Sequence, residues 1–308
     1  MARVKTMPKR PGEDVNPIGK KTAIEHFSPL GLSSGESSNA FNSETNLNLQ
    51  NRFAIFEACK NGDLERVKEL LGRDPSIIQS GDFLIHSAAA HGHLNVVQYL
   101  VEEAKQDAGA VDEKDRTPLW IAARHGNLSV FRYLRDRVNK NQADKYGRTP
   151  LWIAARYGHL DVVKDIKYRV DYLDQADKNG RTPLWIAARH GHLDVVRELI
   201  EANVELPVKA NLNQEDKDGR TPLWVAACFG HYDVVHYLVG AGAEIDKADK
   251  EGRTPLWIAT RNVRVMIGEF LFNAGANPNK ADNDGMTPNQ VKHLVANMPH
   301  TQDLLKHL

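Results

Sequence analysis

A repeat of about 33 residues constrains this chain more than any other feature of its sequence. The string GRTPLWIAARHGHLDVVRELI, from Gly180 to Ile200, recurs with small changes at four other places, and the five copies contain all five tryptophans. The threonine of its TP pair lies at Thr117, Thr149, Thr182, Thr221, Thr254 and Thr287. Successive threonines are 32, 33, 39, 33 and 33 residues apart. A period of this length predicts stacked units that share one continuous core.

Each unit is predicted to form two short helices. The Thr182 hydroxyl can cap the first helix, and Pro183 suits its first position because proline has no N–H group to satisfy. Gly191 can end that helix in the left-handed conformation, and Asp194 lies in the first turn of a second helix. The apolar stripe of the second helix consists of Val195, Val196, Leu199 and Ile200. Neither helix can bury its apolar face alone, so the units must stack.

These residues resemble the ankyrin repeat, most completely in GRTPLWVAACFGHYDVVHYLVGAGAEID. The resemblance covers residues 51–308 and implies an all-α repeat solenoid of helix pairs with β-hairpin fingers. It further implies that partner proteins bind at the finger tips and the concave face, without catalysis. The predicted units are 51–79, 80–112, 113–144, 145–177, 178–216, 217–249, 250–282 and 283–308. Residues 1–50, rich in Ser and Asn, are predicted to form a disordered tail.

Several positions depart from the ankyrin pattern. Tryptophan replaces the family's histidine in five units, Asp115 replaces a finger glycine, and Val263 replaces a turn glycine. Six extra residues lie within 201–216. Lys167 places a charge where the second helix usually has an apolar residue, so residues 164–176 are predicted to exchange amide hydrogens faster than residues 184–200.

Composition narrows the class of protein. The 40 acidic and 40 basic residues balance, and two cysteines are too few for a disulfide framework. The sequence has no apolar run of membrane-spanning length and no apolar core of a signal peptide. These features predict an intracellular, cytoplasmic protein. The basic pairs at 9–10 and 20–21 leave a nuclear location open, although a solvated basic tail explains them better.

No catalytic, metal-binding or cofactor-binding site is predicted. His190 and His192 have no cysteine or carboxylate group at zinc spacing, and Cys228 has no partner base. Asn279 matches a position that the ankyrin family uses to stabilise its finger. The resemblance also implies that an oxygen-sensing hydroxylase could modify it, but the turn role is sufficient.

Variation between units favours binding over a spacer role. The residue before the finger glycine changes, as Tyr146, Asn179, Asp218 and Glu251, and so does the residue before the turn glycine, as His125, Tyr157, His190 and Phe229. A spacer needs no varied surface. The sequence therefore predicts a scaffold or adaptor, with a structural spacer and an inhibitory subunit of an enzyme as alternatives.

The predicted partner-binding residues are two rows of arginines together with Tyr146, Tyr157, His190 and Phe229. The finger row is Arg116, Arg148, Arg181, Arg220 and Arg253; the helix row is Arg124, Arg156, Arg189 and Arg261, interrupted by Cys228. They predict a basic inner surface and a partner protein with an acidic segment, bound by a monomer. Nucleic acid is not expected, because nearby aspartates would repel phosphate. Alternatively, each finger arginine pairs with an aspartate and merely fixes the turn.

The tryptophans are predicted to lie in register near the start of each first helix. They are Trp120, Trp152, Trp185, Trp224 and Trp257. Two interpretations are open. The indoles fill the gap between neighbouring units, as large aromatic side chains usually do, or they form an exposed aromatic track for an extended peptide.

Overall fold

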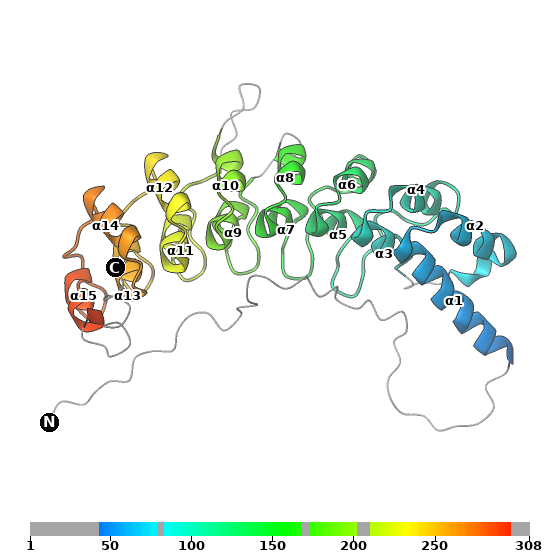
Figure 1. Ribbon diagram of the computed structural model, residues 1–308, viewed down its shortest axis with the longest axis horizontal. Coiled ribbons are helices and arrows are strands. Elements are labelled where there is room, and N and C mark those ends of the chain that lie inside the picture. Colours follow the sequence, from blue (N-terminus) through cyan, green and yellow to red (C-terminus); the bar gives the residue numbers. More distant parts are fainter. Residues whose placement is uncertain (1–42, 79–82, 168–172, 202–209, 297–308) are drawn as a thin grey trace. The chain divides into compact units, whose positions relative to one another are not determined.

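The computed structural model describes residues 43–78, 83–167, 173–201 and 210–296. Within these ranges the chain forms fifteen α-helices and one short 3-10 helix, with no β-strand (Figure 1). The first helices of the units are α1 (Ser43–Asn61), α3 (Leu84–His91), α5 (Pro118–His125), α7 (Pro150–Tyr157), α9 (Pro183–His190), α11 (Pro222–Phe229), α13 (Pro255–Arg261) and α15 (Pro288–Ala296). The second helices are α2 (Leu64–Arg73), α4 (Leu94–Glu102), α6 (Leu128–Arg135), α8 (Leu160–Lys167), α10 (Leu193–Ile200), α12 (Tyr232–Gly240) and α14 (Val265–Asn273), and the 3-10 helix η1 spans Pro75–Ile77.

The helices stack in two rows. From α3 to α13, each first helix packs against the first helices before and after it and against the second helix of its own unit. Figure 1 shows the first helices, such as α5, α7 and α9, in one row and their partners α6, α8 and α10 in the other. This arrangement confirms the predicted all-α repeat solenoid, because each unit completes its core with its neighbours.

The predicted helix signals are confirmed. In α9 the Thr182 hydroxyl accepts a hydrogen bond from the backbone N–H of Trp185 at 3.1 Å, and Pro183 occupies the first turn. The helix ends at Gly191, whose φ of 74° is left-handed. The same threonine cap begins α5, α7, α11 and α13.

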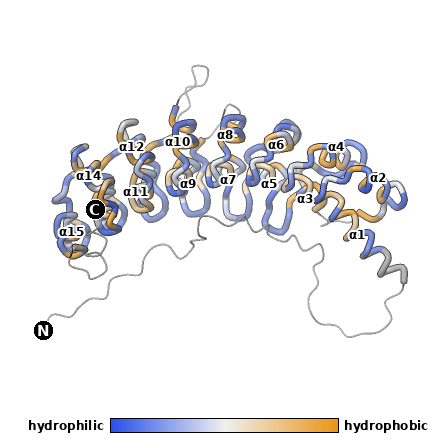
Figure 2. The backbone as a smooth tube through the Cα atoms, in the orientation of Figure 1, coloured by the Kyte–Doolittle hydropathy of each residue, from blue (hydrophilic) through white to orange (hydrophobic). Residues whose placement is uncertain are grey.

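The core runs along the array between the two rows. In α9 the side chains of Leu184, Ile186, Ala187 and Ala188 are completely buried, so adjacent first helices approach closely. Figure 2 shows the hydrophobic residues on the helices, whereas the loops between units are mainly hydrophilic. This distribution matches the predicted stripes and leaves the finger loops as the polar edge of the array.

The fingers are tight turns and not extended hairpins. The Asp177 N–H donates to the carbonyl of Arg181 at 3.0 Å, which closes the turn around Gly180. The next bond joins neighbouring fingers, because the Lys178 N–H donates to the carbonyl of Tyr146 at 2.9 Å. The Gly180 N–H also donates to the carbonyl of Asp177 at 2.9 Å, so the predicted β-hairpin reduces to a two-bond turn, with no strand assigned among the residues that the structure covers.

Helical structure begins before the predicted start of the array. Helix α1 begins at Ser43, eight residues before the predicted start of the array, since no threonine–proline cap fixes the start of the first unit. Residues 1–42 of the predicted tail, the Lys167 side chain, residues 168–172 and residues 202–209 lie outside the described residues. The expected weakness of residues 164–176 and the placement of the six extra residues thus stay predictions.

Turn histidines tie each unit to the one before it. The Nε2 atoms of His159, His192 and His231 lie 2.8, 3.0 and 2.8 Å from backbone carbonyl oxygens at the end of the preceding first helix. Asn127 occupies the same turn position in an earlier unit, and its Nδ2 donates to the carbonyl of Ala90 at 3.0 Å. Asparagine can therefore replace histidine in this contact.

We expect the array to lose stability as the pH falls below the histidine range. Burial lowers the pKa of His159, His192 and His231, since desolvation disfavours the charged ring. A lowered folded pKa means that the unfolded chain binds protons first, so stability is complete above the unfolded pKa of about 6.5 and is lost below it. Because the rings are only half-buried, the expected loss between pH 7.5 and 5.5 is roughly 1–3 kcal/mol in total.

The measurement is urea unfolding followed by circular dichroism at both pH values. The control is the variant carrying His159→Asn, His192→Asn and His231→Asn, which keeps a donor at each turn but has no ring to titrate. Its unfolding free energy should change less with pH than that of the unaltered protein. An identical pH dependence in both proteins would contradict this role of the turn histidines.

Candidate protein-binding surface

The five tryptophans lie in the interior of the array. Trp120 and Trp152 are fully buried, and the most exposed of the five, Trp257, has 7% of its surface accessible. Each indole Nε1–H donates to a backbone carbonyl in the next finger; Trp152, for example, donates to Arg181 at 2.8 Å. The other four bonds measure 2.8–2.9 Å. The packing interpretation therefore holds, and the exposed aromatic track is wrong.

His86 occupies the position that tryptophan holds in the five later units, and its contact shows why tryptophan can replace histidine there. Its Nε2 lies 2.8 Å from the carbonyl oxygen of Arg116, which is the contact that the indoles make in later units. An indole N–H is always a donor, whereas an imidazole donates only in the correct tautomer. Tryptophan thus keeps the bond between units and buries a larger apolar surface.

The finger arginines pair with buried aspartates. The Arg148 Nε lies 2.7 Å from Asp144 Oδ2, while Asp144 Oδ1 accepts the backbone N–H groups of Tyr146 and Arg148 at 2.9 Å. The equivalent ion pairs are Arg116–Asp112, Arg181–Asp177, Arg220–Asp216 and Arg253–Asp249. These contacts match the alternative in which the arginine fixes the turn.

The helix arginines have a different environment. Arg156 and Arg189 are half-buried, and no carboxylate of the described chain lies within ion-pair distance of either. The Arg189 guanidinium lies 4.4 Å from the Phe229 ring centroid, and that of Arg156 lies 5.9 Å from the Tyr157 centroid. Burial lowers the pKa of Arg189, and the charges of Arg181, Arg156 and Arg220 lower it further.

The other two members of the helix row hold the same position in their units. Arg124 lies 5.5 Å from the Tyr157 centroid, and Arg261 lies 6.0 Å from that of Trp257. The finger arginines also approach the indoles. The finger arginine Arg148 and the helix arginine Arg156, for example, both lie within 6 Å of the Trp152 ring centroid. The two predicted rows therefore border the same line of buried tryptophans.

Further predicted contact residues lie along this surface. Tyr146 has 48% of its surface exposed at a finger tip, with the Arg148 guanidinium 4.7 Å from its ring centroid. His190 is exposed and stacks on His192 with 6.1 Å between centroids, whereas Phe229 is half-buried. These residues give the surface aromatic as well as basic character.

Asn279 lies in the turn that follows α14, near the end of the last strong unit. Its backbone N–H donates to Asn277 Oδ1 at 2.9 Å, and its own Oδ1 lies 3.4 Å from Asn289 Nδ2. The side chain therefore links the turn to helix α15, which agrees with the structural role predicted for it.

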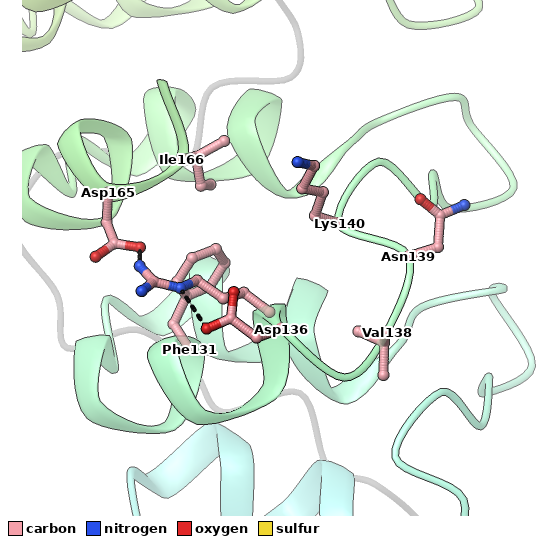
Figure 3. A pocket seen from close by; sticks show the side chains of 8 residues that line it. Phe131, Asp136, Val138, Asn139, Lys140, Asp165 and Ile166 are labelled. Atoms are coloured by element: carbon pink, nitrogen blue, oxygen red, sulfur yellow. Dashed lines mark hydrogen bonds and ion pairs between the residues drawn. The ribbon is translucent and has the colours of Figure 1, made fainter. Parts of the chain in front are cut away.

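A hollow of about 370 Å³ between α6 and α8 was not predicted from the sequence. Phe131 and Ile166 form its buried floor, and Arg135 forms ion pairs with Asp136 and Asp165 at its side. Figure 3 shows Asp165 and Asn139 on opposite sides of this hollow. The remaining lining residues are Val138 and Lys140. The sequence feature that could have indicated this hollow is Arg135, a charged residue at the position where a later unit has the apolar Ile200.

The two cysteines, Cys59 and Cys228, are buried and form no disulfide. Burial raises the pKa of the Cys59 thiol to about 12 and also raises that of Cys228. No group of three or more His, Cys, Asp or Glu side chains able to hold a metal ion occurs in the part of the chain that the structure covers.

Among the placed helices, none has the length and apolar character needed to cross a membrane.

The stacked helix pairs and capped turns define a solenoid repeat protein. The profile for ankyrin repeats in three copies matches residues 36–112, 55–144, 85–174, 137–210, 166–249 and 204–282, so the chain belongs to the ankyrin repeat family. The matches start at residue 36, ahead of the boundary predicted at residue 51.

Curated relatives match only part of this chain. A 93-residue segment is 32% identical to the probable E3 ubiquitin-protein ligase XBOS31 of Oryza sativa subsp. japonica, covering 28% of this chain and 21% of the ligase. An 86-residue segment is 36% identical to alpha-latrotoxin-Lh1a of Latrodectus hasselti, covering 27% of this chain and 6% of the toxin. The E3 ubiquitin-protein ligase XB3 of Oryza sativa subsp. japonica is 31% identical over 91 residues, which make up 28% of this chain and 20% of that ligase. The matched parts thus span about a fifth of these relatives or less.

Proposed function

We propose that the array is a non-catalytic scaffold or adaptor that binds an acidic segment of a partner protein along the helix arginines. Ankyrin repeats bind other proteins. The observation that carries the finer proposal is the pair Arg156 and Arg189, half-buried beside aromatic rings and without a carboxylate within ion-pair distance in the described chain. Carboxylates of a partner would provide the missing counter-charge and speed the encounter.

The finger carboxylates favour a protein over a nucleic acid. Asp144 and its equivalents lie on the same edge as the helix arginines, and each neutralises its finger arginine, so the finger row offers little uncompensated positive charge to a continuous phosphate backbone. A protein segment can place its carboxylates on the helix row alone. A spacer would not require two partly buried arginines to remain without acidic partners, so this observation also speaks against a purely structural array.

The test is a double charge reversal, Arg156→Glu with Arg189→Glu, in the full chain. Partners are first identified by affinity capture and mass spectrometry, and the purified partner is then titrated against both proteins at two salt concentrations. We expect binding to the variant to be roughly 10- to 100-fold weaker and less sensitive to salt, because two attractive charges become repulsive.

Lys164→Glu with Arg197→Glu is the matched control. Both residues are exposed on the second helices of the same two units, so this pair changes the same amount of charge on the other row of helices. Circular dichroism checks that both double variants fold. If both weaken binding of the purified partner equally, or if neither weakens its binding, the proposed surface is wrong.

A further inference from the structure

The charge of the finger differs from unit to unit along the array. Each finger comprises five residues that begin at the buried aspartate and end at the arginine, for example residues 144–148. In the fingers before α7 and α9 the residue ahead of the glycine is Tyr146 or Asn179, so each finger has two bases and one acid. In the fingers before α11 and α13 that residue is Asp218 or Glu251, so acids and bases balance. Of these four fingers, the first two therefore have an excess of positive charge.

The fingers nearer the two ends of the array are acidic. The finger before α5 has two bases and three acids, which are Asp112, Glu113 and Asp115. The finger before α15 has Asp282 and Asp284 and no base. A negatively charged partner would be repelled at both places. The two positive fingers are thus flanked by an acidic finger on one side and a balanced one on the other.

The excess positive charge of these two fingers belongs to lysines. Lys145 and Lys178 are exposed, and neither lies within ion-pair distance of a carboxylate in the residues that the structure places. Arg148 and Arg181 of the same fingers form ion pairs with their own aspartates. The Lys145 Nζ lies 5.4 Å from the Tyr146 ring centroid, at the finger tip. A partner at this edge can therefore reach one lysine in each of the two units.

The helix arginines add positive charge to the same two units. Arg156 and Arg189 each lie 5.9 Å from the ring centroid of the tryptophan in their own helix, Trp152 and Trp185. The finger arginines of these units lie 5.8 Å from the same two centroids. The equivalent residue of α11 is the uncharged Cys228. The helix and finger charges of one unit therefore border the same indole.

Two neighbouring units hold most of the excess positive charge at this edge. With the helix position included, the units of α7 and α9 each have two more bases than acids. The unit of α5 balances when Arg124 is counted with its acidic finger, and the unit of α11 balances as well. The unit of α13 has an excess of one base because of Arg261. Helix α7 packs directly against α9, so the two positive units are adjacent.

The distance between these units sets the form of a matching ligand. Packed helix axes lie about 8–10 Å apart, and an extended chain rises about 3.3 Å per residue. Four consecutive residues therefore reach from one unit to the next. Acids spread over a longer segment would instead lie beside the acidic finger before α5 or the balanced finger before α11.

On the basis of the proposed function, we infer that the acidic segment of the partner is a block of about four consecutive acidic residues bound over α7, α9 and the fingers before them. The opposing charges are Lys145, Arg156, Lys178 and Arg189. Tyr157 and Phe229 lie beside the two arginines, with 5.9 and 4.4 Å between guanidinium and ring centroid, and provide aromatic surface for the residues that flank the block.

The experiment titrates the full chain against two fluorescein-labelled ten-residue peptides of equal composition. The block peptide is Gly-Ser-Gly-Glu-Glu-Glu-Glu-Gly-Ser-Gly. The spread peptide is Glu-Gly-Ser-Glu-Gly-Gly-Glu-Ser-Gly-Glu, whose glutamates span about 30 Å when extended. Fluorescence anisotropy at about 50 mM salt, where surface charges are weakly screened, gives the dissociation constants. We expect the block peptide to bind about 3- to 10-fold more tightly, because the outer glutamates of the spread peptide lie beyond the two positive units.

Two reciprocal substitutions ahead of the finger glycine test this footprint. Asn179→Asp gives the finger before α9 the five-residue sequence of the finger before α11, and it should weaken binding of the block peptide about 2- to 5-fold. Asp218→Asn makes the opposite exchange, and it should strengthen binding of the spread peptide by about the same factor. Each new residue already occupies this place in a neighbouring finger, so both variants should fold, and circular dichroism checks this.

Asp194→Asn is the matched control. It removes the same charge as Asp218→Asn, but from the exposed start of the second helix α10. It should leave both dissociation constants within about twofold of those of the unaltered protein.

The outcomes separate this inference from the proposed function. Equal affinity for the two peptides, or no measurable binding of either, would overturn the footprint over two units. So would an Asn179→Asp variant that binds the block peptide as tightly as the unaltered protein does. The proposed function is decided separately, by the titration of the purified partner against the double charge reversal.

Discussion

Replacing Trp185 with alanine is expected to lower the free energy of unfolding by about 3–5 kcal/mol. The indole has 1% of its surface exposed, and its Nε1–H donates to the carbonyl of Arg220 at 2.9 Å. Removing it leaves a cavity between two units and an unpaired backbone carbonyl. Because a repeat array depends on the interfaces between neighbours, the loss weakens the contact between the units of α9 and α11.

Two further variants divide this effect into its parts. Trp185→Phe keeps most of the apolar volume but removes the donor, and it should cost about 1–3 kcal/mol. Trp185→His keeps a donor of the kind that His86 supplies but loses volume. Its loss of unfolding free energy should be at least that of Trp185→Phe and smaller than that of Trp185→Ala. Guanidinium unfolding followed by tryptophan fluorescence and circular dichroism measures all three. An alanine variant that costs less than 1 kcal/mol would contradict the interior role of this indole.

Gly191→Ala is expected to destabilise the array by roughly 2–4 kcal/mol. Gly191 has a φ of 74°, and the left-handed conformation costs other residues about 1–2 kcal/mol. A Cβ atom there would lie 2.4 Å from His231 Nδ1, so the ring must move. That movement breaks the contact of His231 with the carbonyl of Arg189, which measures 2.8 Å and joins two units.

Gly268→Ala provides the contrast for this prediction. Gly268 lies within α14, and apart from the adjacent backbone of that helix no atom lies within 4 Å of a Cβ added there. Alanine is the better helix former by up to about 1 kcal/mol, so this change should stabilise the protein slightly. Urea unfolding of both variants gives the comparison. If Gly191→Ala unfolds at the same urea concentration as the unaltered protein, the steric argument fails.

The local pattern predicted the helices well because their signals are local. Thr182, Pro183 and Gly191 act within one helix, so their spacing alone indicates where α9 begins and ends. Helix α1 begins at Ser43, which is not followed by proline and has no repeat before it, so the threonine–proline signal does not mark its start. At the end of an array, fewer local sequence signals mark where a helix begins.

The roles of the tryptophans and arginines depend on neighbouring units. The repeat places Trp152 in register, but only the structure shows its bond to Arg181 in the next finger. Likewise, the sequence allowed Arg148 either to bind a partner or to pair with an aspartate. The completely buried side chain of Asp144 favours the pair that fixes the turn. The sequence also does not give the distances between the helix arginines and the nearest carboxylates, which the structure supplies.

The bonds between fingers have a consequence for how the protein tolerates changes in length. The Lys217 N–H donates to the carbonyl of Asn179 at 2.9 Å, as Lys178 does to that of Tyr146, although successive TP pairs are 39 residues apart at the first step and 33 at the second. The bond from Trp185 to Arg220 is likewise 2.9 Å long. The pitch of the array is therefore set at the finger edge, while chain length varies on the side where the second helices end. Extra residues between α10 and the next finger therefore leave the register of the neighbouring units unchanged.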